Sequence, residues 1–147
     1  MPQRRFDRGF EFWVMSASNM LERISNDVLS EHGLTFRQVQ VLGALAMHEG
    51  LTQVQLAEAI LVERSTVVRI LDRMERDGWI ERTPSSTDRR VNIIRETEKV
   101  DAIWKTIRKC GKEIRKRAVA GLSEAQLDAM SETLEAICEN LGGPSLT

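Results

Sequence analysis

Residues 51–95 decide the fold of this chain: LTQVQLAEAILVERSTVVRILDRMERDGWIERTPSSTDRRVNIIR. A short helix pattern over 52–60 is followed, after a brief connection, by a second helix pattern over 63–77. Two short runs rich in β-branched residues come next, at 79–83 and 91–95, with a polar stretch containing a proline between them. The segment therefore predicts two helices and a β-hairpin. In the first helix the residues expected in the core are Val54, Leu56, Ala57 and Ile60.

The helix predicted at 63–77 has two contrasting faces. Its apolar residues recur at i, i+3, i+4 and i+7, which places them on one buried stripe. These residues are Val67, Ile70, Leu71 and Met74. Hydroxyl and guanidinium groups gather on another side, as a helix that reads DNA in the major groove requires, although a solvated face of an ordinary amphipathic helix is the alternative. The predicted DNA contacts of this helix are Arg64, Ser65, Thr66, Val68, Arg69 and Arg73.

The tip of the predicted hairpin is polar and basic. It contains Ser86 and Thr87, followed by Asp88-Arg89-Arg90. An arginine at such a tip can enter a DNA minor groove, whose negative potential attracts the guanidinium. We predict that Ser86, Thr87 and Arg89 contact DNA. Asp88 can hold an arginine by a bidentate pair, so Asp88 and Arg90 are predicted to brace the wing; a plain surface salt bridge is the alternative.

Three segments share one helix-start signal, in which a hydroxyl residue is followed three residues later by glutamine, as in a capping box. The pairs are Thr35 with Gln38, Thr52 with Gln55, and Ser123 with Gln126. Glycines mark the expected helix ends. The helix boundaries are predicted near 34–49, 52–60 and 122–141, with a minor strand before Thr52. Gln53, at the start of the second of these helices, is predicted to touch a DNA phosphate, although a cap or a solvated side chain is slightly favoured.

Long helices are predicted at the two ends of the chain, over about 7–31, 97–119 and 122–141. Their apolar residues alternate spacings of four and three, which favours packing at shallow angles, as in helix bundles. Two copies of the chain would bury much more of these seams than one, so we infer a homodimer, with an intramolecular bundle as the alternative. The predicted fold is mainly α with a small β-hairpin wing. Residues 34–96 form the winged helix-turn-helix domain, and residues 1–33 and 97–147 form a helical dimerisation region.

The composition is that of an ordinary globular protein, with 41% hydrophobic and 29% charged residues and a net charge of −1. The charge is uneven, because residues 62–95 hold eight arginines and only six acids. No apolar run is long enough to span a membrane and the N-terminus has no signal-peptide core, so we expect a cytoplasmic protein without a membrane partner. Two cysteines and two histidines form no ligand cluster, so we predict no metal and no cofactor.

The order of these elements and the wording of the motifs resemble the MarR family of winged helix-turn-helix regulators. The matching stretches are Leu34-Thr35 with Gln38-Val39, Leu56-Ala57, Ser65-Thr66-Val67, Arg73-Met74-Glu75, Gly78-Trp79-Ile80, Arg82 and Asp88-Arg89-Arg90. The resemblance implies a dimer that binds double-stranded DNA at a pseudo-palindromic operator, commonly as a repressor released by a small ligand. After the wing the family commonly has Leu-Thr-x-x-Gly, whereas this chain has Glu96-Thr97-Glu98-Lys99-Val100, which bears on the entry to the next helix.

The resemblance also implies an effector site between the dimer helices and the winged domain. An aromatic or phenolic acid fits the residues expected there, since an arginine can hold its carboxylate, although the two tryptophans are expected more often in a dimer core. The candidate effector residues are Arg8, Trp13, Ser16, Met20 and Trp104. An enzyme is not expected, because no nucleophile motif, phosphate loop or metal cluster is present. A helical protein-interaction module without DNA binding is the alternative function.

Overall fold

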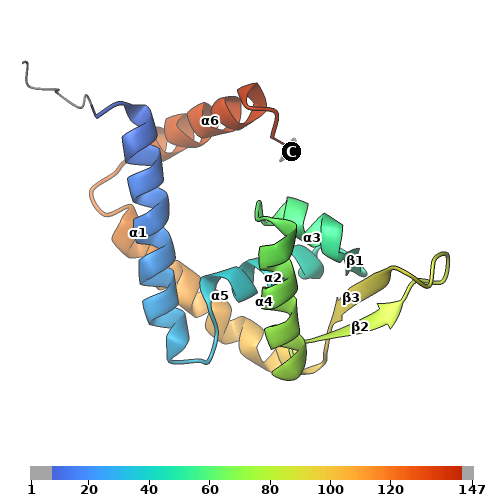
Figure 1. Cartoon of the computed structure of the whole chain (residues 1–147). Helices are drawn as coiled ribbons and strands as arrows, with labels where there is room; N and C mark the ends of the chain where they lie inside the picture. The colour runs from blue at the N-terminus through green and yellow to red at the C-terminus, as the bar shows by residue number, and fades with distance from the viewer. Residues whose placement is uncertain (1–7, 144–147) are drawn as a thin grey trace, which may run out of the picture. The chain divides into compact units, whose positions relative to one another are not determined.

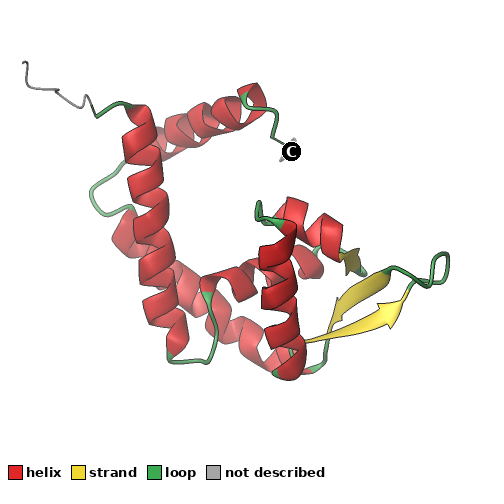
Figure 2. Ribbon diagram, in the orientation of Figure 1, coloured by secondary structure: helices red, strands yellow, loops and turns green. Residues whose placement is uncertain are grey.

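The computed structural model describes residues 8–143, which fold into six helices and a three-stranded sheet (Figures 1 and 2). This architecture confirms the predicted mainly α fold with a small β-hairpin wing. No helix in this range is both long and apolar enough to cross a membrane. The elements are α1 (Phe10–Ser30), α2 (Phe36–Ala46), β1 (Leu51–Thr52), α3 (Gln53–Ala59), α4 (Arg64–Arg76), β2 (Ile80–Pro84), β3 (Asn92–Glu96), α5 (Lys99–Ala118) and α6 (Glu124–Asn140).

The sheet has the strand order β1-β3-β2, with both pairs antiparallel. Strands β2 and β3 form the predicted hairpin, each displaced by one residue from its expected range, and Arg82 lies opposite Ile94. The minor strand expected before Thr52 is β1, which pairs Leu51 with Ile94. Strand β1 joins the hairpin to the start of α3, so β3 is paired along both of its edges.

All three predicted capping boxes are formed. The hydroxyl oxygens of Thr35, Thr52 and Ser123 each accept a hydrogen bond, of 3.2 Å, from the backbone N–H of the glutamine three residues later. Each glutamine side chain in turn accepts from the backbone N–H of its capping residue. Because a side-chain cap stabilises a helix by roughly 1 kcal/mol, these residues fix where α2, α3 and α6 begin.

Gly78 ends α4 in the conformation that its position requires. Its φ is +80°, a left-handed value that residues with a Cβ rarely adopt. Its N–H donates to the Glu75 carbonyl at 3.0 Å, and the next N–H, of Trp79, donates to the Met74 carbonyl at 2.9 Å. This pair of bonds closes the helix and turns the chain directly into β2.

The core joins both helices of the helix-turn-helix to the sheet and to α5. The side chains of Leu56, Leu71 and Ile94, from α3, α4 and β3, are completely buried. Val100 of α5 is equally buried, so α5 begins inside this core. The expectation that Val54 is also buried is wrong: its side chain is 39% exposed, because it lies on the side of the two-turn helix α3 that faces the wing instead of α4.

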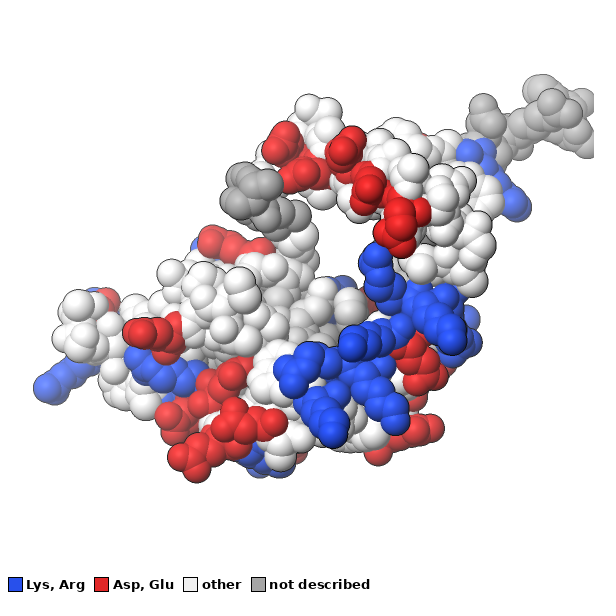
Figure 3. Space-filling model, turned by 180° about the vertical axis from the view of Figure 1, so that it is seen from behind, with Lys and Arg blue, Asp and Glu red and all other residues white. Residues whose placement is uncertain are grey.

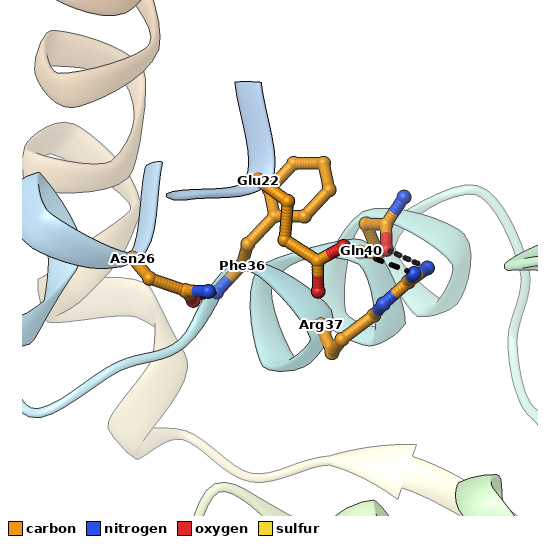
Figure 4. Close-up of polar contacts among 5 residues, drawn as sticks. All are labelled: Glu22, Asn26, Phe36, Arg37 and Gln40. Carbon is orange, nitrogen blue, oxygen red and sulfur yellow. Dashed lines mark hydrogen bonds and ion pairs between the residues drawn. The ribbon is translucent and has the colours of Figure 1, made fainter. Parts of the chain in front are cut away.

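Helix α1 is anchored to α2 through its C-terminal half (Figure 4). The side-chain oxygen of Asn26 accepts a 2.8 Å hydrogen bond from the backbone N–H of Phe36, at the start of α2. The Arg37 guanidinium pairs with the Glu22 carboxylate at 3.3 Å and also donates to Gln40 at 3.1 Å. The predicted start of this helix at Asp7 lies outside the described residues, and the described helix begins at Phe10.

The chain divides into two compact units between Lys112 and Glu113. Helices α1 to α4, the sheet and most of α5 belong to the first unit, and the end of α5 with α6 belongs to the second. This division describes compactness and not function. The boundaries predicted from the sequence, with a winged domain over 34–96 and a dimerisation region outside it, therefore stay a proposal.

Candidate nucleic-acid interface

Helix α4 buries one face and exposes the predicted polar one. Val67, Leu71 and Met74 are completely buried against the core. On the other side Arg64, Ser65, Arg69 and Arg73 are exposed, while Thr66 and Val68 are half-buried at the borders. Ile70, expected in the core, is half-buried and packs at its edge. The apolar stripe thus fixes the rotation of the helix, and the guanidinium groups point to solvent as a consequence.

The C-terminal part of this exposed face carries one arginine more than the sequence reasoning named. Arg76 is exposed and lies eleven residues after Ser65, a spacing that brings it back to the same side of a helix. Arg73 makes a loose ion pair with Asp77 at 3.8 Å, although the Arg73 side chain is 61% exposed. Such a pair contributes little stability, so Arg73 stays available to another anion. The spacing alone would have identified Arg76.

The N-terminus of α4 lacks the side-chain cap that α2, α3 and α6 have. Its N-cap residue is Glu63, whose side chain makes no capping hydrogen bond. The Glu63 carbonyl accepts from the N–H groups of Thr66 and Val67, which leaves those of Arg64 and Ser65 without a partner in the helix. Unpaired N–H groups and the helix dipole together favour an anion at this end, next to the Ser65 hydroxyl.

Arg82 fastens the wing to α4. Its two terminal nitrogens donate to Asp72 at 2.7 Å and to Glu75 at 2.5 Å, and its side chain is only 14% exposed. Arg82 belongs to the stretches that resemble the family, but its role does not follow from that resemblance. A signal was present: Ile80 and Arg82 share one face of β2, so the arginine turns inward, and α4 carries two acids three residues apart.

Two further cations hold the base of the wing. Arg95 on β3 donates to the Glu49 carbonyl and to the Thr83 hydroxyl, each at 2.9 Å. Lys99 donates to the Asp77 carbonyl at 2.6 Å, and its ammonium lies 4.0 Å from the centre of the buried Trp79 ring. The Arg95 contacts join β3 to β2 and to the loop before β1, and the Lys99 contacts join the start of α5 to the end of α4 and to Trp79, so the base of the wing is held from both ends.

The sequence departs from the family pattern at the start of α5. Thr97, the residue that the chain shares with that pattern, holds this segment in place. The Thr97 hydroxyl donates to the Gly78 carbonyl at 2.6 Å, and the Thr97 N–H donates to the Trp79 carbonyl at 3.1 Å. The Val100 N–H then donates to the Thr97 carbonyl at 3.1 Å. The missing leucine and glycine therefore do not prevent this helix from starting at Lys99.

The wing tip is organised by Asp88, but not through the expected ion pair. The Asp88 carboxylate accepts a 2.9 Å hydrogen bond from the backbone N–H of Arg90, and the Asp88 carbonyl accepts from the N–H of Val91 at 3.0 Å. Within residues 8–143 no arginine guanidinium pairs with Asp88, because the carboxylate is occupied by its own turn. Ser86, Thr87, Arg89 and Arg90 are all exposed at this tip.

The wing and α3 share a shallow, open hollow. It is lined by Thr52, Gln53 and Val54 from the start of α3 and by Arg90, Val91 and Asn92 from the wing. Gln53 is half-buried there and Arg90 is exposed. The structure thus brings together two predicted residues that are far apart in the sequence, and it places a cation beside the N-terminus of α3.

The five candidate effector residues lie in two different surroundings. Trp13 and Met20 are 57% and 69% exposed on α1, and Ser16 is half-buried between them on the same helix. The Arg8 guanidinium lies 5.1 Å from the centre of the Phe12 ring, which in turn meets Trp13 edge-on. Trp104, on α5, is half-buried and packs against the core of the first unit. It has the surroundings that a structural tryptophan would have.

One carboxyl group near the wing has a perturbed protonation equilibrium. Burial raises the pKa of Glu96, at the end of β3, and the nearby charge of Asp101 raises it further. One oxygen of the Glu96 carboxylate is buried without a hydrogen-bond partner. The charged form of this side chain is therefore disfavoured in the folded protein.

The described residues give no sign of a metal centre. Between residues 8 and 143 no group of three or more histidine, cysteine or acidic side chains lies close enough together to hold an ion. Both thiols are unpaired, with Cys110 buried in the core and Cys138 half-buried on α6.

The hairpin wing lies beside helix α4, whose exposed side carries arginines. This arrangement defines a winged helix-turn-helix protein. Comparison with known sequences agrees: the model of the MarR family matches residues 32–91. The chain is 26% identical over 121 residues to the uncharacterised HTH-type transcriptional regulator YybA of Bacillus subtilis, covering 82% of this chain and 81% of the relative. Over residues 32–91 the chain is thus similar to the MarR family of transcriptional regulators.

Another relative matches less of its own length. The transcriptional activatory protein BadR of Rhodopseudomonas palustris is 30% identical over 99 residues, which cover 65% of this chain and 57% of BadR. The similarity therefore spans a little over half of that protein.

Solved structures share the same fold. A cysteine-to-serine mutant of Escherichia coli MarR, crystallised with operator DNA, superposes with a TM-score of 0.81 at 22% identity, covering 87% of this chain and 92% of MarR. CouR of Rhodococcus jostii RHA1, bound to p-coumaroyl-CoA, gives a TM-score of 0.78 at 23% identity, covering 91% of this chain and 94% of CouR. At these identities the likeness shows the fold alone.

Proposed function

We propose that this chain is a homodimeric repressor of transcription that acts in the cytoplasm and binds duplex DNA at a pseudo-palindromic operator. The observation that supports this most strongly is that the wing is joined to α4. Arg82 holds strand β2 of the wing against α4 by two ion pairs, so the exposed face of α4 and the wing are presented together to a duplex. The MarR structure with operator DNA, which has the same fold, supports a duplex as the partner.

In this proposal α4 enters the major groove. Ser65 and Arg69 reach base edges, while Thr66 and Val68 lie at the border where a hydroxyl or a methyl group can meet thymine. Arg64 and Arg73, at the two ends of the helix, contact phosphates, and the unpaired N–H groups at the start of α4 add to this.

The wing reaches the neighbouring minor groove. Arg89 inserts its guanidinium there, and Ser86 and Thr87 contact the backbone beside it. Asp88 keeps the tip in shape through its hydrogen bond to the Arg90 N–H. Gln53, in the hollow next to Arg90, contacts a phosphate.

A second copy of the chain completes the binding surface. The N-terminal half of α1 exposes large apolar side chains, including Phe10 and Trp13, that a partner would cover. A two-fold axis would then place the two α4 helices in successive major grooves, about one helical turn apart. This arrangement is the physical reason to expect an operator with two inverted half-sites.

A small ligand would release the repressor from its operator. The candidate is an aromatic or phenolic acid bound near Arg8, Trp13, Ser16, Met20 and Trp104. CouR bound to p-coumaroyl-CoA supports a small aromatic effector in this fold. BadR carries the name of an activatory protein, so the sign of regulation needs its own test: deleting the gene is expected to raise, and not lower, expression of its targets.

Fluorescence anisotropy tests the proposal. The purified chain is titrated against a labelled duplex of its own upstream region and against a scrambled duplex of the same length, at several salt concentrations. We expect tighter binding to the upstream duplex, with an affinity that falls steeply as salt rises, because phosphate contacts release counterions. Equal, weak binding to both duplexes at low salt would contradict the proposal.

A further inference from the structure

Two polar contacts join helix α1 to the start of α2 (Figure 4). The side-chain oxygen of Asn26 accepts a 2.8 Å hydrogen bond from the Phe36 N–H, and the Arg37 guanidinium lies 3.3 Å from the Glu22 carboxylate. Glu22 and Asn26 lie one turn apart on the same side of α1, because residues at i and i+4 share a face. We call Glu22, Asn26 and Arg37 the α1–α2 latch.

The ion pair of the latch differs from the other charged contacts in the elements that it joins. Between residues 8 and 143, the remaining ion pairs involve α4 and the wing, so Glu22–Arg37 is the one that reaches α1. Elsewhere charges of one sign gather on an exposed surface, as the Lys and Arg side chains over α5 do in Figure 3. The side chains of Arg37 and Glu22 are only 35% and 34% exposed, so salt screens their attraction less than that of a fully exposed pair.

The latch lies beside buried packing on both of its helices. Ser25 and Leu29 of α1 are 4% and 3% exposed, and Leu42 of α2 is completely buried in the core that also holds Leu71 of α4. Apolar burial has no preferred direction, whereas a hydrogen bond has one. The core therefore fixes α2 to α4, and the latch fixes the angle at which α1 leaves that core.

In the proposed dimer, α1 is the arm that separates the two winged domains. Its exposed apolar half includes Trp13, which lies roughly 20 Å from Asn26 along the helix at a rise of about 1.5 Å per residue. A rotation of the arm by about 10° at the latch would move that end by roughly 3.5 Å, close to one base pair of a duplex with about 10.5 base pairs in 36 Å. The angle at the latch thus bears directly on the separation of the two α4 helices.

We propose that the α1–α2 latch determines which spacing between operator half-sites the dimer accepts. Glu22, Asn26 and Arg37 are then positioning residues, and none of them is among the residues proposed to contact DNA. This inference rests on the proposed function, a dimer that binds two inverted half-sites. A dimer with an open latch keeps the contacts of each winged domain with its own half-site, but it loses the fixed distance between the two domains.

Fluorescence anisotropy with operators of altered spacing tests this proposal. The duplexes are the upstream operator, the same operator with one base pair inserted or removed at its centre, and an isolated half-site. The variant Arg37→Glu places a second carboxylate opposite Glu22. Its matched control is Arg23→Glu, an exposed position of α1 with the same change in charge. The charge-swapped double variant Glu22→Arg/Arg37→Glu restores an ion pair between the same two positions.

We expect wild type to prefer the native spacing over either altered spacing by about tenfold or more, because a mismatched spacing prevents both domains from binding at once. Arg37→Glu should reduce this preference to about threefold or less, Arg23→Glu should keep it, and the double variant should restore it to within about twofold of wild type. All four proteins should bind the isolated half-site equally. A general loss of fold would weaken half-site binding too, so it gives a different result.

Asn26→Ala provides a second test that leaves the charge unchanged. It removes the hydrogen bond to the Phe36 N–H and should also reduce the spacing preference without weakening half-site binding. The inference is wrong if wild type binds all spacings equally, if Arg37→Glu and Asn26→Ala both keep the wild-type preference, or if the charge-swapped variant fails to restore it. Failure of the proposed function is distinct, because wild type would then bind the upstream operator no more tightly than a scrambled duplex.

Discussion

Helices α4 and α1 carry the same kind of apolar spacing, yet one buries its stripe and the other does not. In α4, Val67, Leu71 and Met74 are completely covered by the rest of the chain. In α1, Trp13 and Met20 remain more than half exposed, although Leu29 near the C-terminal end is buried. The spacing thus indicates which side of a helix is apolar, but it does not indicate which surface covers that side.

The difference has a functional meaning. A helix that reads DNA must be fixed by its own chain, because the rotation set by the core determines which side chains point to the groove. A helix that forms a protein–protein interface exposes apolar side chains in the free chain, and such exposed surface also favours nonspecific association. Helix α1 has both properties in different halves. Its C-terminal half is fixed to its own chain by contacts of Asn26 and Arg37, whereas its N-terminal half exposes apolar side chains.

The largest effect should come from the core beneath α4. Leu71→Ala leaves a cavity at a completely buried position and should lower the free energy of unfolding by about 2–5 kcal/mol. Urea denaturation followed by circular dichroism measures it. A loss below about 1 kcal/mol would mean that α4 is not held by this stripe, and the contrast with α1 would disappear.

The exposed half of α1 should respond differently. Leu21→Glu places a charge on the apolar side and should dissociate the proposed dimer while each chain stays folded, because Leu21 is already partly exposed in one chain. Sedimentation velocity measures the change in mass. Asn19→Glu, which adds the same charge at an exposed polar position, is the control and should remain dimeric. A Leu21→Glu dimer as stable as wild type would show that α1 is not the interface.

Two arginines of the wing sharpen the comparison between structural and binding residues. Arg89→Ala, at the exposed tip, should weaken operator binding about tenfold without lowering stability. Arg82→Ala removes both ion pairs to α4 and should lower stability by roughly 1–2 kcal/mol. Anisotropy and thermal denaturation of both variants separate the two roles. Unchanged operator affinity of Arg89→Ala at matched salt would remove the wing from the interface.

The smallest expected effect concerns Glu96, whose pKa is raised in the folded protein. A raised pKa means that the protonated form contributes stability below the unfolded value, near 4.5, and that this contribution is lost as pH rises through the folded pKa. Glu96→Gln should therefore be more stable than wild type at pH 7, and the two should converge at pH 4. Thermal denaturation across this range checks it; a constant difference would contradict burial as the cause.

Much of the fold could be predicted from local patterns. The capping boxes located the starts of α2, α3 and α6, because a hydroxyl and a glutamine three residues apart satisfy the same backbone groups wherever they occur. The two-sided pattern of α4 correctly separated the buried Val67 and Leu71 from the exposed Ser65 and Arg69. Local hydrogen bonds and helix periodicity depend on neighbours in the sequence, so the sequence contains them directly.

Contacts between distant residues were harder to predict. The roles of Arg82 and Arg95 depend on which element each strand residue faces after folding, and Asp88 bonds its own turn instead of the arginine that was expected. The exposed cations Lys105, Arg108, Lys109 and Lys112 of α5 were hidden for another reason. Residues 96–147 hold nine acids and eight bases, so the net charge of the segment conceals that the acids and the bases lie in different parts of it.

The central claim is that the outward side of α4 reads duplex DNA, and the Arg69→Ala variant tests it most directly. Wild type, Arg69→Ala and the control Arg23→Ala are titrated by anisotropy against the upstream duplex over a range of salt concentrations. We expect Arg69→Ala to bind the upstream duplex about tenfold or more weakly and to lose preference for it over the scrambled duplex, while Arg23→Ala matches wild type. Arg69→Ala binding as tightly as wild type at every salt concentration would contradict the claim.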